Sequence, residues 1–170
     1  MKKTVAFCTL GCKVNQYETD AMRGSFEAEG YEVKESSQEA SVYVINTCTV
    51  TNMADRKSRQ MMHRAKKKNP DGIIVAVGCY VQAAKEQLEE DTLIDLVIGN
   101  NMKSQVVQIV EQYIQDNRHT EDRDAYVADI AHSHEYETMH IETVSEHTRA
   151  YIKIQDGCNQ FCSYCIIPYA

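Results

Sequence analysis

Short apolar runs alternate with longer amphipathic stretches through the first two thirds of the chain. Compact runs rich in β-branched and aromatic residues, each closed by glycine or a polar residue, are typical of buried strands. Apolar residues that recur every three or four positions predict helices between these runs. The expected strands cover 4–10, 31–35, 41–46, 73–77 and 93–98, and the expected helices cover about 15–30, 52–68, 82–90 and 102–114.

The alternation of strands with helices predicts βαβ crossovers and therefore a parallel sheet. With five expected strands, the fold class is α/β, a flavodoxin-like doubly wound parallel sheet in the order 2-1-3-4-5. The loop after the first strand reads Gly11-Cys12-Lys13, and it lacks the glycines of the G-x-G-x-x-G fingerprint. We therefore expect no dinucleotide site in this loop.

Polar residues mark the expected starts of two helices. Asn15 is expected to cap the first helix, and Asn52 with Asp55 three residues later resembles a variant capping box. On the helix at 52–68, the positions expected to face the core are Ala54, Ser58, Met61, Met62 and Ala65.

Regular patterning fades after Gln115, where polar and acidic residues dominate. We interpret 116–146 as a linker with one or two short strands, between an N-terminal domain at 1–115 and a second unit at 147–170. The run Tyr151–Ile154 predicts the first strand of that second unit. Four histidines in and beside the linker have poor spacing for a metal site, and we interpret them as solvated side chains: His132, His134, His140 and His147.

A dense cysteine loop follows that expected strand. Cys158, Cys162 and Cys165 have the spacing C-x3-C-x2-C, which is typical of ligands for a soft metal or an iron–sulfur cluster. A structural zinc ion needs four ligands, whereas this loop supplies three, and the nearest upstream candidate is His147. An iron–sulfur cube held by three thiolates leaves one iron open, so the pattern favours a cluster over zinc or a chance grouping.

Three further cysteines are far apart in sequence but occupy equivalent places in the expected fold. Cys12, Cys48 and Cys79 each come just after an expected strand: the first, the third and the fourth. Those strands are neighbours in the order 2-1-3-4-5, and the carboxyl ends of parallel strands share one edge, where ligands bind. We therefore expect the three sulfurs to converge, the alternative being buried, inert thiols. Cys8 lies inside the first expected strand and is expected to pack as a small apolar residue.

Charge and cysteine content narrow the class of protein. The net charge is -7, yet the stretch Thr51–Asn69 holds seven Lys and Arg residues against one Asp, so a nucleic-acid partner is compatible with the overall acidity. This basic face either contacts phosphates or is simply solvated.

Seven cysteines in 170 residues are too few for a disulfide scaffold. We see no secretion signal and no apolar run long enough to span a membrane, and a reducing cytoplasm fits the thiols.

Four separated motifs then agree in order with one known family. Tyr164 just before the third cysteine of the loop makes that loop resemble the radical S-adenosylmethionine enzymes. With TLGCKVNQYET after the first strand, NTCTVT after the third and VGCYVQ after the fourth, the chain resembles the methylthiotransferases. The first motif is most similar to the branch that acts on N6-threonylcarbamoyladenosine in transfer RNA. Other branches act on isopentenyladenosine in transfer RNA or on a ribosomal protein.

The resemblance implies two [4Fe–4S] clusters and S-adenosylmethionine as cofactors. Cys12, Cys48 and Cys79 would hold an auxiliary cluster, Cys158, Cys162 and Cys165 would hold the radical cluster, and Tyr164 would lie against the adenine or, alternatively, pack as an ordinary aromatic. The implied reaction inserts a methylthio group at C2 of the modified adenine beside the anticodon. One S-adenosylmethionine supplies the methyl group and another supplies the radical that removes a hydrogen.

The family also implies partners and missing parts. Transfer RNA would be the substrate, a flavodoxin or ferredoxin would donate electrons, and the sulfur donor is not identified. Only five residues follow Cys165, so 147–170 would be the start of a truncated β/α barrel. We expect the 170-residue piece alone to show no turnover. The competing classes are an iron–sulfur electron carrier and a zinc-binding RNA module.

Overall fold

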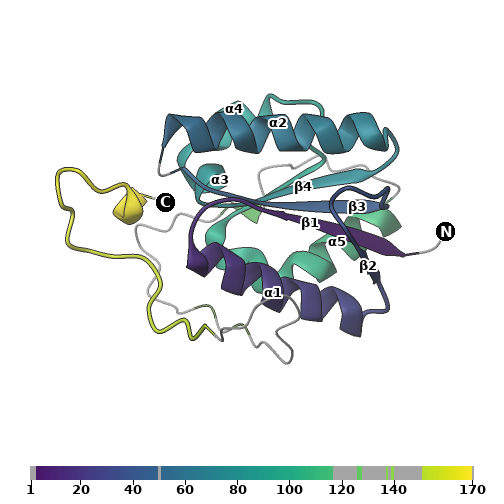
Figure 1. Ribbon diagram of the computed structural model, residues 1–170, viewed down its shortest axis with the longest axis horizontal. Coiled ribbons are helices and arrows are strands. Elements are labelled where there is room, and N and C mark those ends of the chain that lie inside the picture. The colour runs from purple at the N-terminus through teal and green to yellow at the C-terminus, as the bar shows by residue number, and fades with distance from the viewer. Residues whose placement is uncertain are drawn as a thin grey trace.

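The computed structural model describes residues 3–49, 51–116, 126–127, 137, 139 and 151–169. Five parallel strands form one sheet in the order β2-β1-β3-β4-β5, and helices cover both of its faces (Figure 1). The predicted class, a flavodoxin-like α/β sheet in the order 2-1-3-4-5, is therefore confirmed. No described helix is long and apolar enough to cross a membrane.

The elements follow the alternation that the sequence predicts. The strands are β1 (Thr4–Thr9), β2 (Glu32–Lys34), β3 (Val42–Thr47), β4 (Ile73–Gly78) and β5 (Leu96–Ile98). The helices are α1 (Lys13–Ala28), α2 (Asn52–Lys68), α3 (Cys79–Ala83), α4 (Lys85–Glu89), α5 (Val106–Gln115), and the 3-10 helices η1 (Asn100–Gln105) and η4 (Ile167–Tyr169).

The central strand β3 sets the register of the sheet. Asn46 near its end lies opposite Thr9 of β1 and Val77 of β4, and Thr47 lies opposite Gly78. All residues of β3 and β4 are buried, because helices cover both faces of the sheet. A parallel strand buried on both faces needs a nearly continuous apolar run, which is why VYVINT and IIVAVG read as strands.

Two apolar layers separate the sheet from its helices. One face packs against α1 and α5, and the other packs against α2, α3 and α4 (Figure 1). Phe26 of α1 is fully buried and contacts Phe7 and Tyr31 edge-on, with ring centroids 5.7 and 4.9 Å apart. On the other face Met62 and Ala65 of α2 are buried as expected.

Both predicted helix caps are wrong in detail. Thr51, not Asn52, is the N-cap residue of α2, and its side chain accepts a hydrogen bond from the Ala54 backbone N–H. Helix α1 begins two residues before Asn15, with Cys12 at the N-cap position. Asn15 lies in the first turn of α1 and is buried, and its amide donates to the Thr47 carbonyl oxygen at the end of β3. The sequence alone cannot distinguish an asparagine that caps a helix from one that bonds to a neighbouring strand.

Two later helices also differ from the expectation. The helix predicted at 82–90 is two short helices, α3 and α4, divided at Ala84, whose φ of -134° is not helical. Helix α3 begins at Cys79 itself, directly after β4. The helix predicted at 102–114 starts as the 3-10 helix η1 and becomes α-helical only at Val106.

The few described residues of the expected linker lie against the sheet domain. The Gly99 backbone N–H donates to the Tyr126 carbonyl oxygen at 2.8 Å, and the Tyr17 hydroxyl donates to the Met139 carbonyl oxygen at 2.9 Å. Met139 is buried in the same core as Phe26. The remainder of 116–146, with its expected short strands and linker histidines, and His147 lie outside the described residues.

The strand predicted at Tyr151–Ile154 is wrong: this segment forms neither a strand nor a helix. Ile152 and Ile154 are 84% and 89% exposed. A strand needs a neighbour to pair with its backbone groups, and no described strand runs beside this segment. An alternating apolar pattern without such a neighbour does not form a strand.

Replacing the core side chain of Phe26 tests the layer under α1. We expect Phe26→Ala to lower the free energy of unfolding by about 3–5 kcal/mol, because it leaves a cavity between α1 and β1. Ile114→Ala on the exposed side of α5 is the control, with a change within about 0.5 kcal/mol. Urea unfolding followed by circular dichroism measures both, and equal losses would contradict the assignment of Phe26 to the core.

Candidate metal centre at the carboxyl edge of the sheet

The carboxyl ends of β1, β3 and β4 carry one cysteine each. Cys12 is the N-cap residue of α1, Cys48 follows β3 directly, and Cys79 is the first residue of α3. The strands are parallel and adjacent, so their carboxyl ends lie at one edge of the sheet. We call this edge, with Cys12, Cys48 and Cys79, the cysteine rim.

Two glycines allow the backbone to come very close at the cysteine rim. A Cβ added at Gly11 would lie 2.6 Å from the Cys48 Cβ and 2.7 Å from the Cys48 Sγ. A Cβ added at Gly78 would lie 2.5 Å from the Thr47 carbonyl oxygen. Both glycines have positive φ, +106° and +99°, which other residues rarely adopt. The loop that bears Cys12 is therefore pressed against Cys48.

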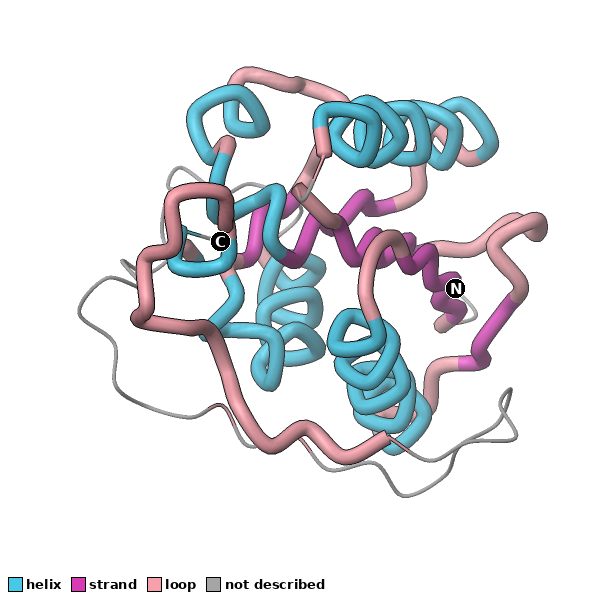
Figure 2. Tube along the Cα trace, turned by 60° about the vertical axis from the view of Figure 1, so that its left-hand side comes forward, coloured by secondary structure: helices cyan, strands magenta, loops and turns pink. Residues whose placement is uncertain are grey.

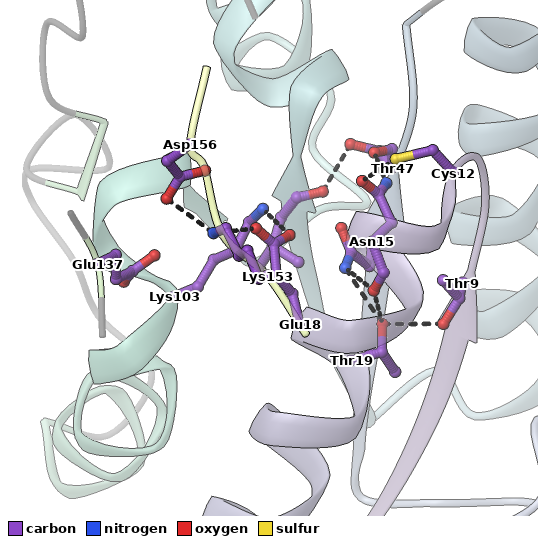
Figure 3. Close-up of polar contacts among 12 residues, drawn as sticks. Thr9, Cys12, Asn15, Glu18, Thr19, Thr47, Lys103, Glu137, Lys153 and Asp156 are labelled. Atoms are coloured by element: carbon purple, nitrogen blue, oxygen red, sulfur yellow. Dashed lines mark hydrogen bonds and ion pairs between the residues drawn. The ribbon is translucent and has the colours of Figure 1, made fainter. Parts of the chain in front are cut away.

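Two buried amides, those of Asn15 and Asn46, join the strand ends at the cysteine rim, and Figure 3 shows Asn15 beside Thr47 and Cys12. The Asn15 amide nitrogen donates to the Leu10 and Thr47 carbonyl oxygens at 2.8 and 2.7 Å. The Asn46 amide nitrogen donates to the Asn15 carbonyl oxygen at 2.9 Å and to the Thr19 hydroxyl oxygen at 3.1 Å. These bonds connect the first turn of α1 with the ends of β1 and β3, so the backbone that carries Cys12 and Cys48 is cross-linked.

The three thiols differ in exposure. Cys12 is exposed and donates a weak hydrogen bond to the Asn15 amide oxygen at 3.5 Å, Cys48 is buried, and Cys79 is half-buried. Burial raises the pKa of the Cys79 thiol, Lys103 opposes this, and Glu18, Cys48 and Cys12 raise it further.

Shared placement is not the same as a formed metal site. Among the residues that the structure describes, no group of three His, Cys, Asp or Glu side chains is arranged to hold a metal ion. The structure thus places Cys12, Cys48 and Cys79 at the predicted edge of the sheet. The convergence of their sulfurs on one ligand stays a prediction. Cys8 lies half-buried in β1 against the core under α2, and burial raises the pKa of its thiol.

The second cysteine set lies on an open loop. Cys158 and Cys162 are exposed and Cys165 is half-buried, and the Cys165 backbone N–H donates to the Cys162 carbonyl oxygen at 3.0 Å. Phe161 has a positive φ of 48°, which bends the loop between the first two cysteines. Tyr164 is 91% exposed and makes no described ring contact, so its expected place against an adenine stays a prediction.

The segment that leads into this loop runs along the edge of the molecule where the strands end (Figures 1 and 2). Lys153 donates to a carboxylate oxygen of Glu18 in α1 at 2.9 Å, and Lys103 of η1 is ion-paired with the other oxygen (Figure 3). Sequence reasoning missed these three residues. Their separations of 85 and 135 positions leave no local signal that could have revealed the pairs.

The basic face of α2 is partly used inside the molecule. Arg59 donates to the Tyr80 hydroxyl, Lys66 pairs with Asp95, and Lys68 donates to a backbone carbonyl oxygen. The other basic residues of this helix are exposed: Arg56, Lys57, Arg64 and Lys67. Their exposure fits both a solvated face and a phosphate-binding face.

The sequence matches known proteins along nearly its whole length. Threonylcarbamoyladenosine tRNA methylthiotransferases of Bacillus subtilis (strain 168) and Aquifex aeolicus (strain VF5) are 44% identical over 167 residues and 43% identical over 166 residues. Each alignment covers 98% of this chain. A tRNA-2-methylthio-N(6)-dimethylallyladenosine synthase of Clostridium perfringens is 30% identical over 176 residues, covering 99% of the chain.

These matches cover only part of the relatives, namely 36%, 40% and 38% of their lengths. The chain thus spans little more than a third of the proteins that it resembles. The family described as uncharacterized protein family UPF0004 matches residues 4–99, which include the whole sheet and the cysteine rim. More than half of the chain therefore matches this family, and we conclude that the chain belongs to the UPF0004 family.

Proposed function

We propose that this chain is part of a radical S-adenosylmethionine methylthiotransferase that inserts a methylthio group at C2 of N6-threonylcarbamoyladenosine beside the anticodon of transfer RNA. The observation that carries the proposal is the placement of Cys12, Cys48 and Cys79 after three adjacent parallel strands. The substrate is suggested by the higher identity to relatives named for threonylcarbamoyladenosine, 44% against 30% for a relative named for dimethylallyladenosine.

The residues at the cysteine rim fit an iron–sulfur cluster. Three thiols are the donor set that a cube with one open iron requires. Gly11 and Gly78 leave no room for a Cβ, so they keep the backbone close to where an inorganic core would lie. Cys12, Cys48 and Cys79 would hold this auxiliary cluster.

The C-x3-C-x2-C loop would hold the second cluster through Cys158, Cys162 and Cys165. Its open form, with two exposed cysteines, leaves the thiols accessible to iron. S-adenosylmethionine would bind beside this loop, with Tyr164 against its adenine. When bound, the two clusters supply an electron that cleaves S-adenosylmethionine and an exchangeable metal position that presents sulfur.

The rest of the chain has supporting roles in this proposal. The sheet domain at 1–115 carries the auxiliary site, 116–146 connects it to the second unit, and 147–170 begins the radical domain. The buried amides of Asn15 and Asn46 hold the strand ends together so that Cys12 and Cys48 keep their spacing. Transfer RNA is the substrate, a flavodoxin or ferredoxin supplies electrons, and an unidentified donor supplies sulfur.

Iron content tests the two ligand sets separately. After anaerobic reconstitution with iron and sulfide, we expect about eight irons per chain, four in each cluster. Replacing Cys12, Cys48 and Cys79 together by Ala should leave about four, whereas Cys8→Ala, the matched control, should keep about eight. Iron and sulfide assays with absorption spectroscopy give the result.

Other outcomes of that assay would identify the competing classes. A spectrum of the remaining cluster that changes on adding S-adenosylmethionine supports the radical site. Clusters indifferent to S-adenosylmethionine would instead indicate an electron carrier. Stoichiometric zinc without iron would indicate a zinc-binding RNA module and reject the proposal.

Nucleoside mass spectrometry of transfer RNA tests the substrate. Cells that lack the full-length gene product should lose the methylthio form of N6-threonylcarbamoyladenosine and accumulate the unmethylthiolated nucleoside. The wild-type gene should restore the product, and a Cys158→Ala variant should not, because one ligand of the radical site is missing. If methylthio-isopentenyladenosine disappears instead, the substrate assignment is wrong.

Two glycine variants test the close approach at the cysteine rim. Gly30→Ala places a Cβ at a positive φ in open space, and the expected loss is about 1–2 kcal/mol of unfolding free energy. Gly11→Ala adds the same strain and a collision with Cys48, so we expect a loss larger by at least about 1 kcal/mol. Urea unfolding of the metal-free chain measures both, and equal losses would show that Gly11 does not contact Cys48.

A further inference from the structure

Lys153 is buried between two exposed isoleucines. Its side chain is 1% exposed, whereas Ile152 and Ile154 on either side are among the most exposed apolar residues described. Burial of apolar side chains and exposure of lysine is the ordinary arrangement, so this segment reverses it. Lys153, and not the isoleucine on either side of it, is the residue that packs against the sheet domain.

The ion pairs around Lys153 join three parts of the chain: α1, η1 and the segment of Lys153 itself (Figure 3). Its ammonium group donates to the Glu18 carboxylate at 2.9 Å and to the Asp156 carboxylate at 2.7 Å. Lys103, also almost fully buried, is ion-paired with the second oxygen of Glu18. Glu18 thus bridges two lysines with its two oxygens. We call Glu18 and Lys103 the Glu18–Lys103 pair.

The charges around this site compensate one another. Burial opposes ionisation of Glu18, but Lys103 and Lys153 outweigh it and hold the pKa of Glu18 below its ordinary value. Burial raises the pKa of Glu137, whose carboxylate accepts a hydrogen bond from the Ser104 backbone N–H. A buried ammonium group without a carboxylate is costly, so the ionised form of Glu18 stabilises Lys153 in this position.

Both ends of this contact are tied to cysteine sites. Glu18 lies six positions after Cys12 in the helix that Cys12 caps, and Lys153 lies five positions before Cys158. A second contact runs in parallel: the Lys13 ammonium group lies 5.7 Å from the centre of the Tyr151 ring. The start of α1 therefore contacts the segment that leads into the C-x3-C-x2-C loop.

We infer that Glu18 and Lys153 are positioning residues. Lys153 binds the Glu18–Lys103 pair, and this contact fixes the C-x3-C-x2-C loop relative to the cysteine rim. The contact itself is independent of any bound group. Its consequence for chemistry rests on the proposed function, in which a radical made at one site must be used beside the other. Reacting groups held in a fixed relation react much faster than loosely tethered ones.

Lysine acylation tests the contact in the metal-free protein. Peptide mass spectrometry after brief treatment with an N-hydroxysuccinimide ester should show Lys153 reacting at least about tenfold more slowly than exposed Lys57 and Lys67, because it is buried and ion-paired. Glu18→Gln should remove most of this protection. Glu111→Gln, which removes a carboxylate that pairs with Lys3 far from this site, should leave it unchanged.

The partition of S-adenosylmethionine between products tests the positioning role in the full-length enzyme. Lys153→Met retains the Glu18–Lys103 pair, so the sheet domain should fold and load iron normally. The variant should still form 5′-deoxyadenosine, with the ratio of 5′-deoxyadenosine to methylthio nucleoside raised on the order of tenfold or more. Ile154→Met, a neighbouring exposed position given the same side chain, should keep the wild-type ratio.

Three results would overturn the inference. Lys153 of the wild-type protein could acylate as fast as Lys57, Glu18→Gln could leave Lys153 protected, or Lys153→Met could keep the wild-type product ratio and rate. Failure of the proposed function has a different signature, because the wild-type enzyme would then make no methylthio nucleoside. The acylation result would stand in that case.

Discussion

Parallel pairing of β3 with β1 and β4 is the constraint on which the remaining structure depends. Because the three strands run in one direction, the loops that follow them open at one edge of the sheet. The amides of Asn15 and Asn46 then join those loops to the first turn of α1. The shared edge on which Cys12, Cys48 and Cys79 lie, although they are 31 to 67 positions apart in sequence, is a direct consequence of this geometry.

Features set by local pattern could be predicted from the sequence. The apolar runs of β3 and β4 indicated strands because a parallel strand covered on both faces must be largely apolar. The alternation of strands and helices indicated a doubly wound sheet and so its strand order. The positions of Cys12, Cys48 and Cys79 at one edge followed from that order. The structure adds the close backbone approach at Gly11 and Gly78, which precede Cys12 and Cys79.

Features set by contacts between distant segments could not be predicted. Asn15 is a common cap residue, and only the neighbouring strand end, Thr47, reveals that its amide bridges two strands. The alternation in Tyr151–Ile154 suggested a strand, yet the isoleucines are exposed and Lys153 is buried. The partner that reverses this pattern, Glu18, is 135 positions away and carries no local sign of its role.

The contact between α1 and the segment around Lys153 also has a consequence for the order of assembly during translation. Glu18 and Lys103 are both synthesised before Lys153, and the whole parallel sheet precedes it on the ribosome. Elements synthesised early can fold before later ones emerge. The receiving surface can therefore be complete when the cysteine loop leaves the exit tunnel, so the loop docks onto a preformed surface instead of having to organise one.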